Sequence, residues 1–166
     1  TRADQIVDRA ADADILLTNK TPLRGETLQL LPQLKFISVL ATGYNIVDIS
    51  AASTRGIPVA NVPEYGTDSV AQHVVAVMLH FAHQCALHDR LVREGEWQRR
   101  GDFCFWHTPL VELAGKQLGI VGFGRIGRRV GTLADALGMS VLACDVSRDQ
   151  PPPYRAFSWG SIEDVF

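Results

Sequence analysis

Short apolar runs alternate with helical periodicity over the first 60 residues of the chain. Three runs have strand length and three intervening segments place apolar residues at helical spacing; the runs are 14–18, 36–40 and 57–60, and the helical segments are 2–11, 25–34 and 47–54. Pro58 predicts an edge or end position for the third run, because proline cannot donate to a sheet ladder. Gly56 suits a left-handed cap of the helix before it. Alternation of this kind predicts a parallel sheet with helices on its faces.

The pattern changes after residue 66, where we expect one long helix over residues 67–94. Ser69 and Gln72 have the spacing of a capping box at its start, and Gly95 can end it. The middle of this helix, residues 74–79, is apolar nearly all round. Such a helix is expected to be buried between layers or against a partner subunit.

An irregular segment over residues 97–110 leads into a second alternating region. Its apolar cluster, residues 103–106, is expected to be packed rather than free in solvent. The second alternating region predicts a strand at 116–121, a helix at 125–137, a strand at 141–145, and a short strand running into a helix within 157–166.

Composition narrows the class of protein. The 166 residues are 46% hydrophobic and 20% charged, with a formal net charge of −2, which is typical of a globular protein and argues against nucleic-acid binding. No apolar run reaches the roughly 20 residues of a membrane span. Three widely spaced cysteines suit a reducing compartment, so we expect a cytoplasmic protein. The chain begins at Thr1 without methionine or a signal-peptide pattern, and we expect it to be an excerpt of a longer protein.

The strongest local motif is a glycine fingerprint, G-x-G-x-x-G, that follows a predicted strand and opens a predicted helix. Its glycines are Gly122, for the tight turn, Gly124, for close approach of a pyrophosphate, and Gly127, for close packing of the helix on the strand. The helix N-terminus, with the amides of Arg125 and Ile126, offers unpaired N–H groups to phosphate. A glycine-rich turn with no ligand is the alternative explanation of the same motif.

An acidic residue completes the fingerprint. Asp145 ends the next predicted strand, 18 residues after Gly127, close to the spacing of an acid that binds the adenosine ribose hydroxyls. A carboxylate there repels a 2′-phosphate and so favours NAD over NADP. Arg148, three residues on, weakens that preference.

The loop after the second predicted strand is a further candidate site. Thr42 and Gly43 are small residues at the carboxyl end of a parallel strand, where open α/β sheets bind ligands, and their backbone amides can hold a carboxylate. Taken alone, such a loop is more often a simple turn. No metal site is expected, because no carboxylate or cysteine completes a ligand set with the histidines of the long helix, which are His73, His80, His83 and His88.

Three blocks of sequence together resemble a known family. They are residues 39–63, with the segment Ala-Thr-Gly-Tyr-Asn, residues 67–73, which open the long helix, and residues 102–127, which lead into the glycine fingerprint. In this order they resemble the NAD-dependent D-2-hydroxyacid dehydrogenases, and within them the glycerate dehydrogenase (hydroxypyruvate reductase) branch.

The resemblance implies an α/β fold with two incomplete domains. Residues 1–66 resemble a flavodoxin-like substrate domain that lacks its first strand. Residues 67–110 resemble a long hinge and dimer helix with a crossing arm. Residues 111–166 resemble the first half of a Rossmann NAD-binding domain.

The resemblance also assigns roles to single residues. The amides of Thr42 and Gly43 match those that hold the substrate carboxylate, and Thr67 matches a position near the cofactor. Arg125 and Ile126 match the pair that meets the pyrophosphate, while Asp145 matches the ribose acid. Asn45 and Gln72 depart from the aspartate and glutamate that many members carry at these two positions.

The family's catalytic arginine, glutamate and histidine belong to segments that follow the third nucleotide-domain strand, so no catalytic residue is expected in this chain. The resemblance implies part of an oxidoreductase that reduces a 2-keto acid, such as hydroxypyruvate or glyoxylate, to a D-2-hydroxy acid with NADH. It also implies a homodimer formed through residues 67–94, and an isolated chain without activity. The alternative is a non-catalytic NAD(H)-binding or dimerisation module.

Overall fold

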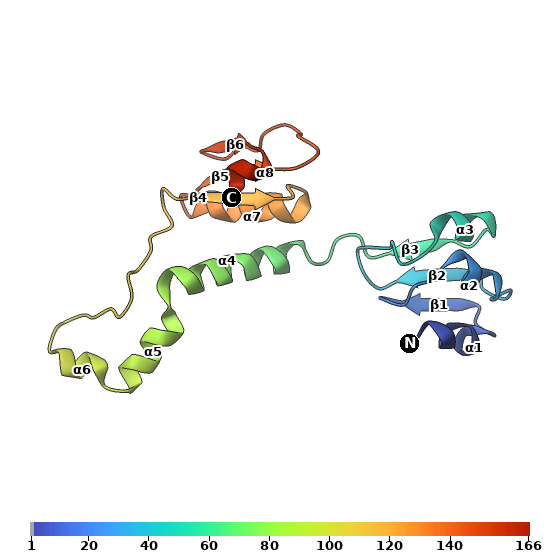
Figure 1. Cartoon of the computed structure of the whole chain (residues 1–166), viewed down its shortest axis with the longest axis horizontal. Coiled ribbons are helices and arrows are strands. Elements are labelled where there is room, and N and C mark those ends of the chain that lie inside the picture. The colour runs from blue at the N-terminus through green and yellow to red at the C-terminus, as the bar shows by residue number, and fades with distance from the viewer. Residues whose placement is uncertain (1) are drawn as a thin grey trace. The chain divides into compact units, whose positions relative to one another are not determined.

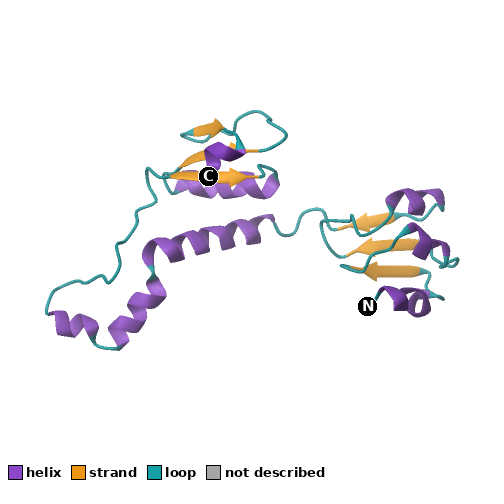
Figure 2. Ribbon diagram, viewed as in Figure 1, coloured by secondary structure: helices purple, strands orange, loops and turns teal. Residues whose placement is uncertain are grey.

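The chain folds into two compact units, the first ending at Tyr65 and the second beginning at Gly66 (Figure 1). A computed structural model describes residues 2–166. Thr1, the first residue of the predicted 1–66 domain, lies outside the described residues. Both units combine parallel strands with helices, as Figure 2 shows, and this confirms the predicted α/β class.

The first unit is a three-stranded parallel sheet with helices in its connections. Its elements are a 3₁₀ helix (Ala3–Gln5), α1 (Ile6–Ala10), β1 (Ile15–Thr18), α2 (Gly25–Gln29), β2 (Phe36–Val39), α3 (Ile49–Thr54) and β3 (Val59–Asn61). The strand order is β1-β2-β3, with Leu17 opposite Ser38 and Ser38 opposite Ala60. The three predicted strands and the edge position of the third are therefore confirmed. Gly56 has a φ of +65°, as expected of a left-handed cap.

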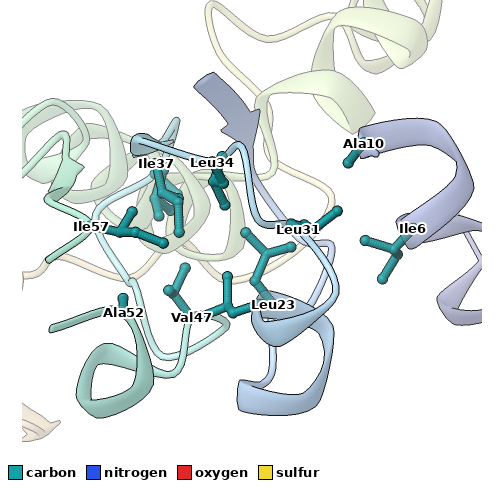
Figure 3. Close-up of a cluster of buried hydrophobic side chains, with 12 residues drawn as sticks. Ile6, Ala10, Leu23, Leu31, Leu34, Ile37, Val47, Ala52 and Ile57 are labelled. Carbon is teal, nitrogen blue, oxygen red and sulfur yellow. The ribbon is translucent and has the colours of Figure 1, made fainter. Parts of the chain in front are cut away.

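Aliphatic side chains form the core of the first unit (Figure 3). Leu28, Leu31 and Ile37 are fully buried, and Leu23 is nearly so. The central strand β2 buries its residues most completely, whereas the edge strand β1 leaves Leu17 68% exposed.

Helix α2 ends at Gln29, before the predicted end at Leu34, and Pro32 lies just beyond it, where a proline cannot continue a helix. The Arg55 guanidinium donates to the carbonyl oxygens of Leu28 and Leu31, the second at 2.9 Å. Each of these carbonyls also accepts a backbone amide, from Leu31 and Leu34 respectively, so Arg55 adds a second bond to each and ties the end of α2 to the residue after α3.

The second unit holds a second parallel sheet and the long helical segment. Its elements are α4 (Thr67–His83), α5 (Cys85–Arg93), α6 (Glu96–Arg100), β4 (Gln117–Val121), α7 (Arg125–Ala136), β5 (Ser140–Cys144), β6 (Phe157–Trp159) and α8 (Ile162–Val165). The strand order is β4-β5-β6, all parallel, and α4 packs along α7. A Cβ on Gly119 would meet Val165 of α8, while the next residue, Ile120, contacts the α7 side. Successive strand residues face opposite sides, so α7 and α8 cover opposite faces of this sheet.

The prediction of one unbroken helix over residues 67–94 is wrong. Gln84 takes a left-handed conformation, with φ 49° and ψ 40°, and the axes of α4 and α5 diverge there by 51°. The capping box is also wrong, because the helix begins two residues before Ser69, with Gly66 as its N-cap. No helix within residues 2–166 is on its own long and apolar enough to cross a membrane, and the bent pair α4 and α5 meets that criterion by length and composition only.

Burial of the long helix is one-sided rather than all round. Ala71 is fully buried, and Val74 and Met78 pack in the core beside α7. Phe81, by contrast, is 70% exposed. Among residues 2–166, therefore, the covered face of α4 is the one that packs beside α7.

The segment after α5 is more ordered than predicted, and its aromatic cluster is only partly packed. Helix α6 forms there, and Glu96 pairs with Arg100 one turn on, at 3.1 Å. The Phe105 ring lies 6.1 Å from that of His88, centre to centre. Phe103 is 87% exposed and Trp106 is 59% exposed, so the expectation of a packed cluster fails for these two residues.

Candidate functional site

The turn between β4 and α7 is shaped by its three glycines. Gly122 has a φ of +90°, and its amide donates to the carbonyl oxygen of Cys144 at the end of β5, at 2.8 Å. A Cβ on Gly127 would collide with the Gly122 carbonyl, so this glycine lets α7 pack directly on the turn. A Cβ on Gly124 would meet nothing within 4 Å. Gly124 is thus the glycine that keeps open space at the start of the helix.

The first turn of α7 presents unpaired donors beside that open space. Its N-cap is Gly124, which has no side chain to cap the helix, and the first helical bond runs from the Arg128 amide to the Gly124 carbonyl at 2.9 Å. The amides of Arg125, Ile126 and Gly127 have no acceptor among residues 2–166. Such a helix end attracts anions through its N–H groups and its partial positive charge. The residues present therefore fit a phosphate group.

Asp145 borders the same turn and is held in its ionised form. Its carboxylate accepts from the Ser147 amide at 3.2 Å and from the Phe123 amide, which lies between the first two glycines. These bonds, the Ser147 bond first, lower the pKa of Asp145 below its ordinary value, and the nearby Arg128 charge contributes less. An ionised carboxylate with both oxygens oriented is a ready acceptor for hydroxyl groups of a ligand.

The turn rests on an aromatic cluster. Phe123 is 3% exposed, and its ring lies 5.2 Å from that of Phe157 and 5.4 Å from that of Trp159. Tyr154 packs against the helix at Gly131 and donates its hydroxyl to the Arg128 carbonyl at 2.6 Å. Because Phe123 carries one of the amides that bind Asp145, its burial fixes the position of the carboxylate.

Thr67 begins α4 in the same unit, and an ion pair joins its neighbour Asp68 to α7. Asp68 Oδ1 lies 2.6 Å from Arg129 Nε on α7. Thr67 itself is half-buried. The second unit thus contains all the predicted cofactor residues, from Thr67 through the three glycines, Arg125 and Ile126 to Asp145.

Thr42 and Gly43 lie in the first unit, in a loop bonded to the end of β3. Asn61 Nδ2 donates to the Thr42 carbonyl at 2.8 Å, and Thr42 Oγ1 donates to the Val62 carbonyl at 3.0 Å. Within the described part of the chain the amides of Thr42 and Gly43 find no acceptor. The loop therefore offers two neutral donors to a small anion. A hollow of about 630 Å³ is lined mostly by α3 and by residues 56–61, which include β3, and neither Thr42 nor Gly43 lines it.

Several contributors were not singled out from the sequence. Phe123 and Ser147 bind Asp145 through their backbone amides, and no side-chain pattern signals such a role. Arg128 follows the last glycine and could have been noticed as a cation next to the fingerprint. Across residues 2–166, no three His, Cys, Asp or Glu side chains gather in a way that could hold a metal ion.

Comparison with known proteins gives a consistent picture. A family model described as D-isomer specific 2-hydroxyacid dehydrogenase, catalytic domain, matches residues 1–161. A hydroxypyruvate reductase of Blautia hydrogenotrophica is 48% identical over 90% of this chain, and a glycerate dehydrogenase of Methylorubrum extorquens is 41% identical over 86% of it. The chain spans 46% of each of these proteins, which is about half of their length.

Solved structures share the arrangement of elements. A Thermus thermophilus protein superimposes with a TM-score of 0.77 and 30% identity, covering 99% of this chain and 51% of that one. An Aquifex aeolicus D-lactate dehydrogenase, described as complexed with NAD and lactic acid, gives a TM-score of 0.71 and 27% identity, covering 96% of this chain and 46% of that one.

Proposed function

The chain belongs to the D-isomer specific 2-hydroxyacid dehydrogenase family, and from this premise we propose that it is part of an NAD-dependent oxidoreductase. The reaction is reduction of a 2-keto acid of the hydroxypyruvate or glyoxylate type to a D-2-hydroxy acid. The observation that carries the proposal is the open space at Gly124, bordered by free helix amides and by an ionised Asp145. Similarity to a hydroxypyruvate reductase and a glycerate dehydrogenase supports the substrate class.

We propose that the second unit binds the adenosine and pyrophosphate part of NAD(H). The amides of Arg125 and Ile126 would hold the pyrophosphate, with Gly124 leaving room for it. Asp145 would accept hydrogen bonds from the ribose hydroxyls, and Thr67 would lie near the cofactor. When bound, the cofactor supplies the hydride that reduces the carbonyl carbon.

The first unit would bind the substrate. The amides of Thr42 and Gly43 have the free donor capacity to hold a carboxylate, and Asn61 fixes the loop through the Thr42 carbonyl. In this assignment the first unit is the incomplete substrate domain. Helices α4 to α6 form the hinge and dimer arm, and the rest of the second unit is the first half of the Rossmann domain.

Proton transfer to the carbonyl oxygen would come from outside residues 1–166. The resemblance places the family's arginine, glutamate and histidine after the third nucleotide-domain strand, which corresponds here to β6. Residues 1–166 alone are therefore expected to bind ligands without turning them over.

Association of two copies through α4 and α5 is also part of the proposal. Val70, Val77 and Phe81 of α4 expose 42%, 40% and 70% of their surfaces, and a second copy would cover such apolar groups. The exposure of Phe103 and Trp106 supports the second candidate, a non-catalytic NAD(H)-binding or dimerisation module, because those side chains suit an interaction surface.

Oxidation of NADH, followed by its absorbance, distinguishes the two functions. The protein as its gene encodes it should consume NADH with hydroxypyruvate or glyoxylate, while residues 1–166 alone should not. A protein that binds NADH but consumes none with any small 2-keto acid would support the binding module and contradict the enzyme.

A further inference from the structure

Charged side chains gather around Asp145 in a way that the proposed NAD(H) site does not require. Arg128 comes from the first turns of α7, while Arg148 and Asp149 come from the loop that follows β5. An arginine near the proposed ribose-binding acid commonly binds the 2′-phosphate of NADP. We therefore consider whether Arg148 or Arg128 is available to bind such a phosphate.

Arg148 is bound to another part of the unit. Its guanidinium donates to the Gly160 carbonyl, twelve residues further on, at 3.0 Å in a partly buried contact. Its charge also helps to lower the pKa of Asp164, behind the bonds that Ser161 makes to that carboxylate. Arg148 therefore braces the loop after β5 against the start of α8, and this bond competes with any binding of a ligand phosphate.

Arg128 lies nearer to the ribose acid and is paired with Asp149. Its Nη2 atom is 3.2 Å from Asp149 Oδ2, and its guanidinium lies 5.1 Å from the centre of the Phe123 ring. Phe123 is the residue whose amide binds Asp145, so Arg128 is held beside that carboxylate. Asp149 is itself oriented by the Ser147 hydroxyl, which donates to its second oxygen at 3.3 Å.

We propose that Asp149 is a positioning residue for cofactor specificity, which occupies Arg128 and so makes the site take NAD(H) in preference to NADP(H). This inference rests on the proposed function, since it concerns the 2′-position of the same adenosine site. It goes beyond Asp145, which acts by direct repulsion of a 2′-phosphate.

The electrostatics give the direction of the effect. A 2′-phosphate near Asp145 would meet a second carboxylate in Asp149 and a cation that is already paired. A free guanidinium binds phosphate through two parallel hydrogen bonds, so releasing Arg128 would improve the binding of a 2′-phosphate. Asp149 is 72% exposed, and exposed ion pairs are weak. The effect of Asp149 on specificity is therefore expected to be modest, about two- to fivefold.

The experiment compares dissociation constants for NADPH and NADH by calorimetry, in the protein as its gene encodes it. Asp149→Asn should tighten NADPH about two- to fivefold and change NADH by less than twofold. Asp149→Glu, which keeps the negative charge, should keep the preference of the unmodified protein for NADH over NADPH. In the double variant Asp149→Asn with Arg128→Gln the gain for NADPH should vanish, which a merely structural role of Asp149 would not produce.

Three results bear on the proposal differently. An unchanged NADPH affinity in Asp149→Asn, with NADH still bound, overturns it. So does a gain that persists when Arg128 is replaced. Failure of the unmodified protein to bind either nucleotide instead contradicts the proposed NAD(H) site itself.

Discussion

The two units share one loop arrangement but differ in the side chain that binds the loop, which is a hydrogen-bond donor in the first unit and an acceptor in the second. Each has a loop at the carboxyl end of a parallel strand, and in each the end of the neighbouring strand binds that loop. In the first unit the Asn61 side chain donates to the Thr42 carbonyl. In the second, the Asp145 side chain accepts from the Phe123 amide. An amide side chain thus stands in one unit where a carboxylate stands in the other.

The difference explains what each loop can recognise. Asn61 donates to the Thr42 carbonyl and leaves the amides of Thr42 and Gly43 free. The first loop therefore carries hydrogen-bond donors and no formal charge. The second loop has free amides at the start of α7 and also an ionised acceptor in Asp145. The first arrangement suits a small carboxylate. The second suits a ligand that has both a phosphate group and hydroxyl donors.

Core substitutions in the first unit should have the largest effect. Ile37→Ala removes a fully buried side chain from the central strand, and we expect a loss of about 2–5 kcal/mol in the free energy of unfolding. Ile15→Ala, on the edge strand β1 at 59% exposure, is the matched control and should change it by less than about 0.5 kcal/mol. Urea denaturation measures both. Equal losses at the two positions would contradict the assignment of the core.

Two glycine substitutions in the second unit separate packing from ligand binding. Gly127→Ala places a Cβ against the Gly122 carbonyl and should destabilise by about 1–3 kcal/mol. Gly124→Ala meets no atom within 4 Å, so thermal stability should stay near that of the unmodified protein while NADH binds more weakly. If Gly124→Ala bound NADH normally, the open space at this glycine would not be where the pyrophosphate approaches.

Asn61→Asp places in the first unit a carboxylate like that of Asp145 in the second. It tests whether the first loop needs an uncharged donor at this position. The carboxylate cannot donate to the Thr42 carbonyl, so stability should fall by about 1 kcal/mol. The added negative charge should also raise the KM for a 2-keto acid while kcat changes less. Asn61→Ala, which loses the bond without adding charge, should raise the KM less than Asn61→Asp does. The same KM in both variants would show that charge at this position is irrelevant.

The smallest effect expected is the pH dependence that Asp145 contributes. Its pKa is lowered in the folded protein, chiefly by the Ser147 and Phe123 amides, so its contribution to stability is present above the unfolded-state pKa of about 3.9. That contribution is lost as the pH falls through the folded-state pKa. Unfolding measured between pH 2.5 and 6 should therefore depend less on pH in Asp145→Asn than in the unmodified protein. Identical curves would mean that the two amides do not favour the charged carboxylate.

Local patterns in the sequence predicted the strands and the glycine turn, because each depends on residues close together in the chain. Five strands were expected within one or two residues of where they lie, and the sixth within the segment that contains it, since buried parallel strands form short apolar runs in the sequence. Gly122 and Gly127 were also identified with the roles that their geometry supports, in the turn and in the close packing of the helix, whereas the approach of a pyrophosphate at Gly124 stays a prediction.

Features that depend on distant residues could not be read from these patterns. The two bonds from Arg55 to the carbonyls of Leu28 and Leu31 join residues 27 and 24 positions apart. The break at Gln84 carries no glycine or proline to signal it, and the apolar pattern continues across it. The bonds of Asp145 come from backbone amides, which every sequence has. The pairing of Asp149 with Arg128 joins side chains 21 residues apart, and no local pattern signals it.

Calorimetric titration with ADP-ribose tests the central claim most directly, because this ligand carries the pyrophosphate and the adenosine ribose without the nicotinamide. The account predicts saturable binding at one site per chain, with clearly weaker binding in Asp145→Asn, where the charged acceptor for the ribose hydroxyls is lost. Absence of binding to the folded, unmodified protein, or equal affinity in Asp145→Asn, would contradict it.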